Sequence, residues 1–332
     1  MPEPEVVASR YATAPAAPPE PTAPEPPAAH CDRRRLWKAA IKWPMYAVAV
    51  MPVLLAAGWR WGRAEVVRLD QLLLFLAAAV LLLAWENLTN DVFDADTGVD
   101  THGKPHSVVN LTGRRDRVAL WANACLGTGL ALMALVAWGS TPLVLALVLA
   151  CCALGYLYQG PPFRLGYRGL GEPLCWLAFG PLATAAGLLA LAPTPTGPAT
   201  VPWGAALVLG SGPALATTLV LFCSHFHQVA EDRAHGKHSP VVQLGTATAA
   251  ALVPWIVALA LALEWAPVVL GRWPLTALLG AIGLPPARRL ITLLGCHHDL
   301  PERVAGSKFL ALRFQALNGL GLALGLALGR WI

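Results

Sequence analysis

The sequence predicts an all-α polytopic membrane protein with nine transmembrane helices. Of its 332 residues, 56% are hydrophobic and only 13% are charged. The mean hydropathy is +0.55. A soluble domain carries about 25% charged residues, so the composition excludes an ordinary soluble fold. The apolar residues gather in runs of about twenty, the length that crosses a bilayer as a helix. None of these runs alternates with period two, so strands are not predicted.

The nine runs follow one another along the chain and are separated by polar or Gly/Pro-containing segments. Eight are continuous, at roughly 43–62, 71–88, 117–138, 142–158, 173–192, 204–226, 246–265 and 309–329. The ninth, 274–295, contains Pro285-Pro286 and Arg288-Arg289, which predict a kinked or partly interfacial helix. Apart from that pair of prolines, only Pro254 is expected to interrupt a span.

Residues 1–34 are predicted to form a disordered Pro/Ala-rich tail, and residues 35–332 a single membrane domain. The first thirty residues hold nine prolines and many alanines. Such a segment buries too little apolar surface to fold. It also lacks the continuous apolar core of a signal peptide.

The placement of Lys and Arg predicts the orientation of the chain. With the N-terminus in the cytoplasm, all but five of the 24 lie in the tail, the even-numbered loops or the adjoining helix ends. The five on the opposite face are Arg60, Arg63, Arg68, Arg272 and Arg330. The positive-inside rule then puts the even-numbered loops in the cytoplasm. The same rule accounts for the net charge of +5, so no nucleic-acid partner is expected.

The densest acidic segment directly follows the second span. Four aspartates fall within ten residues, from Asp91 to Asp100. A single Asp near the bilayer centre costs roughly 2.5–3.5 kcal/mol, so a cluster at a helix mouth indicates a bound cation. Asn90 and Asp94 lie one helical turn apart and share a face, and so do Asp91 and Asp94. These oxygen ligands suit a hard divalent cation that brings substrate phosphates with it. The alternative is a solvated acidic loop.

A second polar segment, 224–237, follows the sixth span and is expected to open on the same side of the membrane. Gln228, Glu231 and Asp232 lie at i, i+3 and i+4 on one helical face, and Lys237 follows shortly after them. Two acidic helix ends that face one cavity suit two metal ions around a diphosphate. The alternatives are two unrelated acidic loops, or zinc bound by the histidines between 225 and 238. Carboxylate, amide and phosphate oxygens are harder ligands than zinc prefers.

The end of the fourth span adds candidate ligands on the same side. Tyr156 and Tyr158 close this span, and a turn rich in glycine and proline follows at 160–173. Arg164 and Arg168 in this turn are candidate diphosphate clamps, because guanidinium groups bind phosphate oxygens through paired hydrogen bonds. Ordinary positive-inside anchoring is the alternative for each arginine.

These motifs resemble those of the UbiA superfamily of intramembrane aromatic prenyltransferases, a fold of nine spans around a central cavity. The first looks like the superfamily's Asn-Asp-x-x-Asp, met here by Asn90, Asp91 and Asp94. Segments 41–46, 107–113, 160–167 and 224–229 are similar to the cyanobacterial and plastid branch that acts on 1,4-dihydroxy-2-naphthoate, as is the position of Asp100. Many superfamily members have a second Asp-x-x-x-Asp, whereas this chain has Gln228-x-x-x-Asp232, as that branch does. The resemblance covers roughly residues 35–330.

The resemblance implies an activity and a cofactor. The implied reaction is Mg²⁺-dependent transfer of a phytyl or polyprenyl group from its diphosphate to 1,4-dihydroxy-2-naphthoate. CO₂ and diphosphate are lost, and the product leads to phylloquinone or menaquinone. The implied Mg²⁺ ligands are Asn90, Asp91, Asp94, Glu231 and Asp232, and the catalytic acids among them are Asp91, Asp94 and Asp232.

The remaining expected site residues contact the two substrates. Lys104, Arg164, Arg168 and Lys237 are expected to bind the diphosphate. Lys42 is expected to receive the naphthoate carboxylate, with snorkelling to the interface as the alternative. Gln228 is expected to contact substrate, and Tyr156 and Tyr158 to stabilise a carbocation.

Two other functions stay open at this point. One is a UbiA-type transferase that uses homogentisate, 4-hydroxybenzoate or a chlorophyllide. The other is a cation-coupled transporter, which requires acidic residues near the middle of the membrane. Here the clustered acids lie at cytoplasmic helix ends, and Glu86 is the deepest candidate. The sequence leaves open the donor chain length, the final quinone and the oligomeric state.

Overall fold

A computed structural model describes residues 29–98, 106–193 and 199–331. Within these ranges nine helical segments are long and apolar enough to cross a membrane, and no strand is present. The all-α membrane fold predicted from the sequence is therefore confirmed.

Three of the nine spans combine more than one helical element, and the other six are single helices. The spanning elements are α1–η1–α2 (Ala29–Ile41, Trp43–Met45, Tyr46–Gly62), α3 (Leu69–Thr97), α5 (Arg115–Trp138), α6 (Pro142–Gln159), α7–η3–α8 (Gly171–Leu177, Ala178–Leu182, Ala183–Ala190), α9 (Trp203–Ser224), α12 (Thr246–Val269), η4–α13 (Leu275–Gly283, Leu284–His297) and α15 (Ser307–Leu328). The short elements are α4 (Val108–Thr112), η2 (Leu165–Arg168), α10 (Val229–Ala234), α11 (Pro240–Leu244), α14 (Pro301–Val304) and η5 (Gly329–Trp331).

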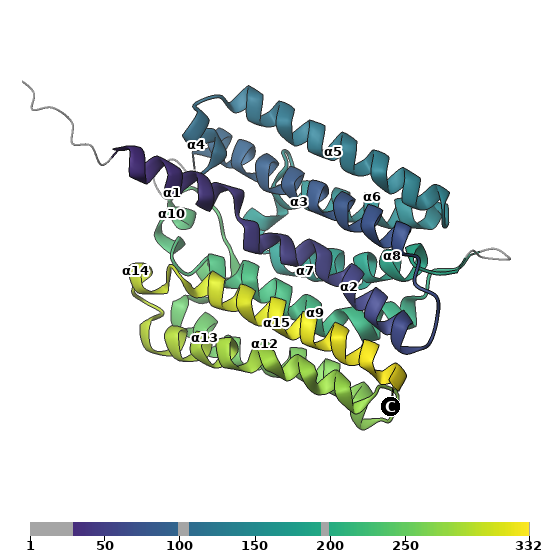
Figure 1. The fold of residues 1–332 in the computed structure, drawn as a ribbon. Helices are drawn as coiled ribbons and strands as arrows, with labels where there is room; N and C mark the ends of the chain where they lie inside the picture. Colours follow the sequence, from purple (N-terminus) through teal and green to yellow (C-terminus); the bar gives the residue numbers. More distant parts are fainter. Residues whose placement is uncertain (1–28, 99–105, 194–198, 332) are drawn as a thin grey trace, which may run out of the picture.

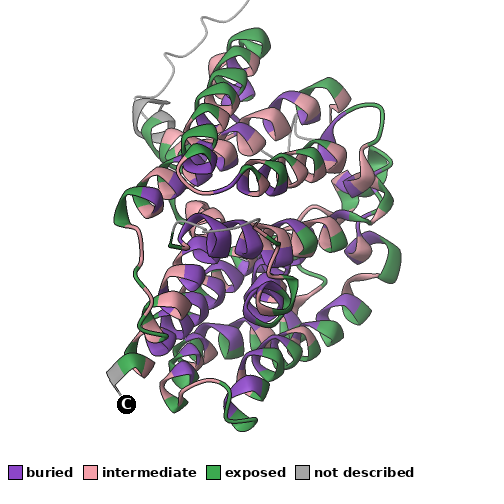
Figure 2. Cartoon of the chain, turned by 90° about the vertical axis from the view of Figure 1, so that its right-hand side faces the viewer, coloured by how far each residue is buried: buried purple, intermediate pink, exposed green. Residues whose placement is uncertain are grey.

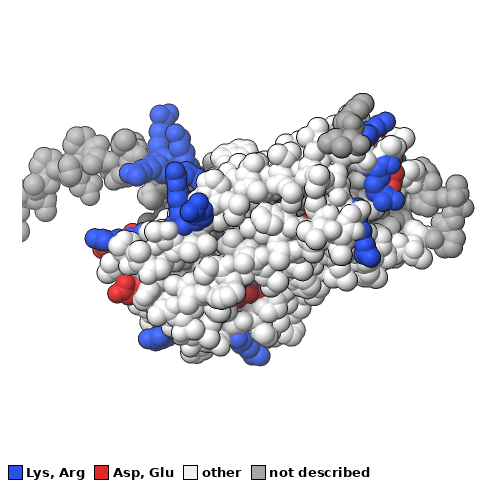
Figure 3. Space-filling model, turned by 90° about the horizontal axis from the view of Figure 1, so that it is seen from below, with Lys and Arg blue, Asp and Glu red and all other residues white. Residues whose placement is uncertain are grey.

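The spans run side by side, and the short helices α4, α10 and α14 lie with α1 at one end of the bundle (Figure 1). We call this the motif end, because α3 and α9 both deliver their polar segments there. Charged side chains gather toward the two ends of the molecule, and most of the surface between them is uncharged (Figure 3). This uncharged belt is the surface expected to face lipid.

The centre of the bundle is formed by α9 and α15. Buried residues concentrate in the middle of the bundle and exposed ones on its outer helices (Figure 2). α15 packs against α2, η4 and α9, and α9 packs also against α12. Glycines allow these close approaches: a Cβ on Gly58 of α2 would lie 2.3 Å from the carbonyl oxygen of Ala323, and one on Gly321 2.3 Å from that of Leu279. Small residues at such crossings are how helices pack tightly in a membrane.

Two spans are irregular, and they correct the expectation about interrupted helices. The fifth span is broken at Gly180, whose backbone is not helical, and Pro181 follows it. Pro254, in contrast, lies inside α12, which continues through it. The eighth span begins as the 3₁₀ segment η4 and becomes α-helical at Leu284, directly before Pro285 and Pro286.

The second span is longer than its apolar run. α3 continues to Thr97, past the predicted end at residue 88, and stops at Gly98 in the left-handed conformation (φ 77°). Asn90, Asp91 and Asp94 therefore all lie on the last turns of a helix. This placement fixes the spacing of their side chains.

Candidate active site

A cavity of about 600 Å³ lies inside the bundle and is lined by residues of α2, α3, α6, α7 and α9. Phe75 and Asp94 both line it. At about 1.5 Å per residue, their separation corresponds to roughly 28 Å along α3, close to the thickness of a bilayer's hydrocarbon core. The deep walls, which we call the apolar interior, are formed by Val53, Phe75, Ala79, Met133 and Val148. The wall near the motif end, which we call the charged mouth, is formed by Lys42, Asn90, Asp94, His225, Gln228 and Lys237.

The first acidic motif presents two of its three members to this cavity. Asn90 and Asp94 line the mouth one helical turn apart, as predicted. Asp91 is buried behind the mouth, where one carboxylate oxygen accepts a hydrogen bond from the backbone N–H of Val108 (2.9 Å). Its other oxygen lies 3.6 Å from the ammonium of Lys42. Asp91 therefore fixes Lys42, a cavity residue, in place.

The second acidic motif is assembled around Asp232, which is fully buried. One carboxylate oxygen lies 3.1 Å from Nδ1 of His225, and the other 3.7 Å from the ammonium of Lys237. Gly236, with φ 70°, makes the turn that brings Lys237 back over the helix. Gln228 lines the cavity, whereas Glu231 is only half-buried and is not part of the cavity wall.

Tyr167 joins the two motifs. Its hydroxyl donates a hydrogen bond to Asp94 (3.2 Å) and lies 2.9 Å from the hydroxyl of Thr97. The ammonium of Lys237 lies 5.6 Å from the centre of its ring, within cation–π range. Burial raises the pKa of Tyr167, and the nearby Asp94 carboxylate raises it further, so the hydroxyl stays protonated and can donate. A continuous chain of contacts thus leads from the first motif through Tyr167 and Lys237 to Asp232.

Two more side chains, those of Glu172 and His227, lie close to the second motif. Glu172, at the start of α7, places a carboxylate oxygen 4.0 Å from Nε2 of His225. His225 therefore lies between the carboxylates of Glu172 and Asp232. His227, which also lines the cavity, has a pKa lowered to about 4, chiefly by burial and then by the nearby Lys308. It is neutral at neutral pH and adds no charge to the mouth.

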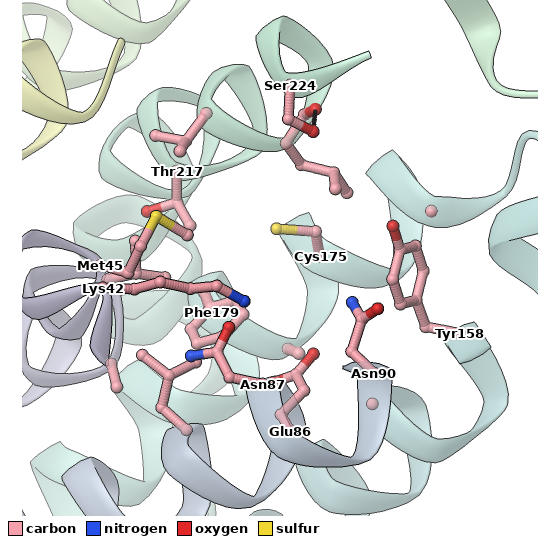
Figure 4. A pocket seen from close by; sticks show the side chains of 18 of the residues that line it. Lys42, Met45, Glu86, Asn87, Asn90, Tyr158, Cys175, Phe179, Thr217 and Ser224 are labelled. Carbon is pink, nitrogen blue, oxygen red and sulfur yellow. Dashed lines mark hydrogen bonds between the residues drawn. The ribbon is translucent and has the colours of Figure 1, made fainter. Parts of the chain in front are cut away.

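The close view of the cavity shows where the expected substrate-binding residues lie. Lys42 enters from the α1–α2 junction, and Asn90 of α3 and Tyr158 of α6 face the same hollow (Figure 4). Lys42 and Tyr158 therefore both line the cavity. Glu86 also lines the cavity, one turn before Asn90.

Three predicted substrate-binding residues in the described part of the chain do not line this cavity. Arg164 and Arg168 line a neighbouring surface groove with Tyr167 and His238, and the Arg164 guanidinium lies 5.9 Å from the centre of the Tyr167 ring. The hydroxyl of Tyr156 donates a hydrogen bond to the carbonyl of Pro161 (2.7 Å), which turns this side chain away from the cavity. Lys104 lies outside the described residues, as does Asp100.

The mouth carries oxygen ligands of the kind that a divalent cation takes. No group of three or more His, Cys, Asp or Glu side chains placed to hold a metal occurs in the described ranges. Mg²⁺ does not require one, because it keeps several waters and is held by one or two carboxylates together with substrate phosphates. The buried Oδ1 of Asn90 accepts no hydrogen bond from any described residue, and Asp94 lies one turn beyond it. This pair of oxygen ligands fits Mg²⁺ that arrives with a diphosphate.

Sequence comparison identifies relatives along most of the chain. A sequence model of the UbiA prenyltransferase family matches residues 47–312. The chain is 41% identical over 293 residues to the 2-carboxy-1,4-naphthoquinone phytyltransferase of Synechocystis, covering 88% of this chain and 93% of that protein. It is 37% identical over 297 residues to the chloroplastic 2-carboxy-1,4-naphthoquinone phytyltransferase of Arabidopsis thaliana, covering 89% of this chain and 77% of that protein.

Structural comparison finds the same fold in a more distant protein. The structure of a UbiA homologue from Archaeoglobus fulgidus, bound to DMAPP and Mg²⁺, superposes with a TM-score of 0.51 at 18% sequence identity. The match covers 85% of this chain and 97% of that one. At this level of identity the likeness extends to the arrangement of helices alone.

Proposed function

Because the chain belongs to the UbiA prenyltransferase family, we propose that it transfers a phytyl group from phytyl diphosphate to 1,4-dihydroxy-2-naphthoate, with loss of CO₂ and diphosphate. This reaction belongs to phylloquinone or menaquinone biosynthesis. The observation that carries the proposal is the cavity itself. Its charged mouth is lined by Asn90 and Asp94 of the first motif and by Gln228 and Lys237 of the second polar segment, and its interior is apolar. The two phytyltransferase relatives favour this acceptor over homogentisate, 4-hydroxybenzoate or a chlorophyllide.

The charged mouth binds the diphosphate end of the donor. Asn90 and Asp94, which line the mouth, would hold Mg²⁺. The buried Asp91 and Asp232, with Glu231 next to Asp232 on α10, would supply further negative charge. When bound by these residues, Mg²⁺ would neutralise the diphosphate and make it a better leaving group.

Cationic side chains support the same step. Lys237 lines the mouth and donates charge-assisted hydrogen bonds to the phosphate oxygens. Because Asp232 and Tyr167 already hold Lys237 in position, its charge is in place before the allylic C–O bond breaks. Lys104 joins it in this proposal, as the sequence suggests. We place this mouth on the cytoplasmic side, because most Lys and Arg residues lie toward it.

The apolar interior holds the isoprenoid chain. Its walls carry no charged group below Glu86, and they exclude water, which would otherwise capture an allylic cation. Tyr158 and Phe179 also line the cavity near the level of the motifs, where the faces of their rings favour positive charge. Tyr156 has no part in this site, because its ring does not line the cavity.

The acceptor binds between the mouth and the interior. Lys42 binds its carboxylate, since this ammonium faces the hollow beside α3 (Figure 4). The two phytyltransferase relatives are named for the quinone form of the acceptor. We propose that the dihydroxy form reacts, because attack on an allylic cation requires an electron-rich ring. Assays with the acceptor held reduced or held oxidised separate these two forms.

The proposal is tested with purified protein in lipid. Asp94→Asn and Asp232→Asn keep side-chain shape and remove one charge each, so Mg²⁺-dependent phytyl transfer should fall by at least about 100-fold. Asp116→Asn is the matched control, because that side chain is 97% exposed on α5. It should keep wild-type activity. Wild-type turnover in both Asp94→Asn and Asp232→Asn would refute the site. Mass spectrometry of the quinone formed from mixed prenyl diphosphates identifies the preferred donor.

A further inference from the structure

Glu86 is an acidic residue inside the cavity with no assigned part in diphosphate binding. It lies on α3 one helical turn before Asn90, so its carboxyl group lies about 6 Å deeper along the helix axis. Figure 4 shows this side chain reaching into the same hollow as Lys42 and Asn87. A Cβ on Gly155 of α6 would lie 3.4 Å from the carboxyl carbon, so the glycine leaves the room that Glu86 occupies.

The surroundings of Glu86 differ from those of the other buried acids. Asp91 faces Lys42, and Asp232 faces Lys237 and His225. Among the described residues no hydrogen bond or ion pair is found for the Glu86 carboxyl group. The thiols of Cys151, Cys152 and Cys175 line the same cavity.

An acid in such a place is unfavourable unless a ligand uses it. A carboxyl group in the membrane interior without a partner destabilises the fold, and a leucine or glutamine of similar size would fill the same space. Intramembrane acids that face a cavity are therefore candidates for a functional role. A bound molecule that offers a hydroxyl group to Glu86 supplies the missing partner.

We infer that Glu86 is the catalytic base for the acceptor: it accepts a hydrogen bond from the hydroxyl beside the acceptor's carboxylate and takes that proton during the reaction. This inference rests on the proposed function. It assigns a chemical class to the ligand of Glu86, an aromatic ring with adjacent hydroxyl and carboxylate groups. Lys42 binds the carboxylate of the same ring, so the two side chains together fix which ring carbon faces the prenyl group.

The proton transfers balance in four steps. The ring carbon that carries the carboxylate forms a bond to C1 of the prenyl group, as the allylic C–O bond breaks and its electron pair leaves with diphosphate. The neighbouring hydroxyl gives its proton to Glu86, and the O–H electron pair completes a ring ketone. The ring now holds a β-keto carboxylate, which releases CO₂ and leaves its bonding pair as an enolate. The enolate oxygen takes the proton back from Glu86.

This cycle needs no other acid or base and no redox partner. Glu86 begins and ends each turnover as a carboxylate. The proton stays within the cavity, away from the water at the mouth, during the whole sequence.

The first experiment separates catalysis from binding. Glu86→Gln keeps the size and the hydrogen-bonding capacity of the side chain but not its basicity, so kcat should fall about 100-fold or more. The KM for phytyl diphosphate should stay within about threefold of wild type. Glu86→Asp keeps a carboxylate one methylene further from the ring and should recover part of the lost kcat. Glu264→Gln is the matched control, because Glu264 is a buried acid that hydrogen-bonds Asn318 (2.8 Å) and does not line the cavity.

The second experiment tests which hydroxyl Glu86 serves. With 1-hydroxy-2-naphthoate, which keeps the hydroxyl beside the carboxylate, Glu86→Gln should lose activity as it does with the full acceptor. With 4-hydroxy-2-naphthoate, which lacks that hydroxyl, wild type and Glu86→Gln should be equally slow. Equal kcat for wild type and Glu86→Gln with the full acceptor overturns the inference and leaves the proposed function standing. A wild-type protein that transfers no prenyl group to the naphthoate overturns the proposed function itself.

Discussion

Tyr167→Phe is the sharpest test of how the two acidic motifs are held together. The substitution removes only the hydroxyl that donates to Asp94 at 3.2 Å and lies 2.9 Å from Thr97. The ring stays, and with it the cation–π contact to Lys237. A hydrogen bond to a charged group contributes about 1.5–3 kcal/mol. Because 3.2 Å is long for an O–H donor and Tyr167 is half-buried, the lower end of that range applies.

A loss of about 1.5 kcal/mol corresponds to roughly a tenfold decrease in kcat/KM for the prenyl diphosphate. The assay is Mg²⁺-dependent transfer from labelled phytyl diphosphate at limiting donor concentration. Tyr156→Phe is the control, since its hydroxyl donates to the Pro161 carbonyl outside the cavity, and its kcat/KM should stay within twofold of wild type. If Tyr167→Phe and Tyr156→Phe are equally active, Tyr167 does not position Asp94 and the bridging argument is wrong.

Three further predictions address packing, donor selection and pH. Gly58→Ala places a methyl group 2.3 Å from a carbonyl oxygen of α15, so it should destabilise the protein by about 1–3 kcal/mol in a thermal unfolding assay. Gly127→Ala is the control and should not destabilise the protein, because the added methyl group meets no atom within 4 Å. Ala79→Phe fills part of the apolar interior, so kcat/KM for phytyl diphosphate should fall about tenfold or more while kcat/KM for the shorter geranyl diphosphate changes little. Equal losses for both donors would contradict the proposal that the apolar interior holds the isoprenoid chain. The folded pKa of His227, about 4, is below its unfolded value of 6.5, so the unfolded chain binds the proton first and stability should fall as pH drops from about 6.5 toward 4. In His227→Gln the free energy of unfolding should depend less on pH between about 4 and 6.5. If it depends on pH as strongly as in the wild type, His227 is not the cause.

The number and order of the spans could be predicted from the sequence, because a helix that crosses a membrane needs a run of about twenty apolar residues and such runs are visible in the hydropathy. Hydropathy did not locate the end of α3. The helix continues through polar residues after it leaves the apolar core, and it ends only at Gly98. Hydropathy also missed the break at Gly180. That break arises where the fifth span approaches α9 so closely that a Cβ on Gly180 would lie 2.8 Å from the side chain of Ala214, and such a contact leaves no mark in local composition.

The candidate site was predictable where it depends on helical spacing. The placement of Asn90 and Asp94 on one wall, and of Lys237 near Asp232, followed from positions along single segments. Tyr167, in contrast, reaches Asp94 only through the packing of η2 against the ends of other helices. Contacts between residues more than seventy positions apart carry no periodic signal, so sequence reasoning placed the arginines of that turn in the cavity and overlooked its tyrosine.

The depth of the cavity divides the reaction between two environments. Breaking the allylic bond requires fixed positive charge near the diphosphate, and Lys237 is held at the mouth for that purpose by Asp232. Bond formation requires a dry site, and Glu86 lies one helical turn, about 6 Å, further inside. At that separation two unit charges interact by about 3 kcal/mol at an effective dielectric constant near 20. An allylic cation at the depth of Glu86 and a unit of negative charge on the diphosphate at the mouth attract each other by this amount, and the ring, held between Lys42 and Glu86, captures the cation there.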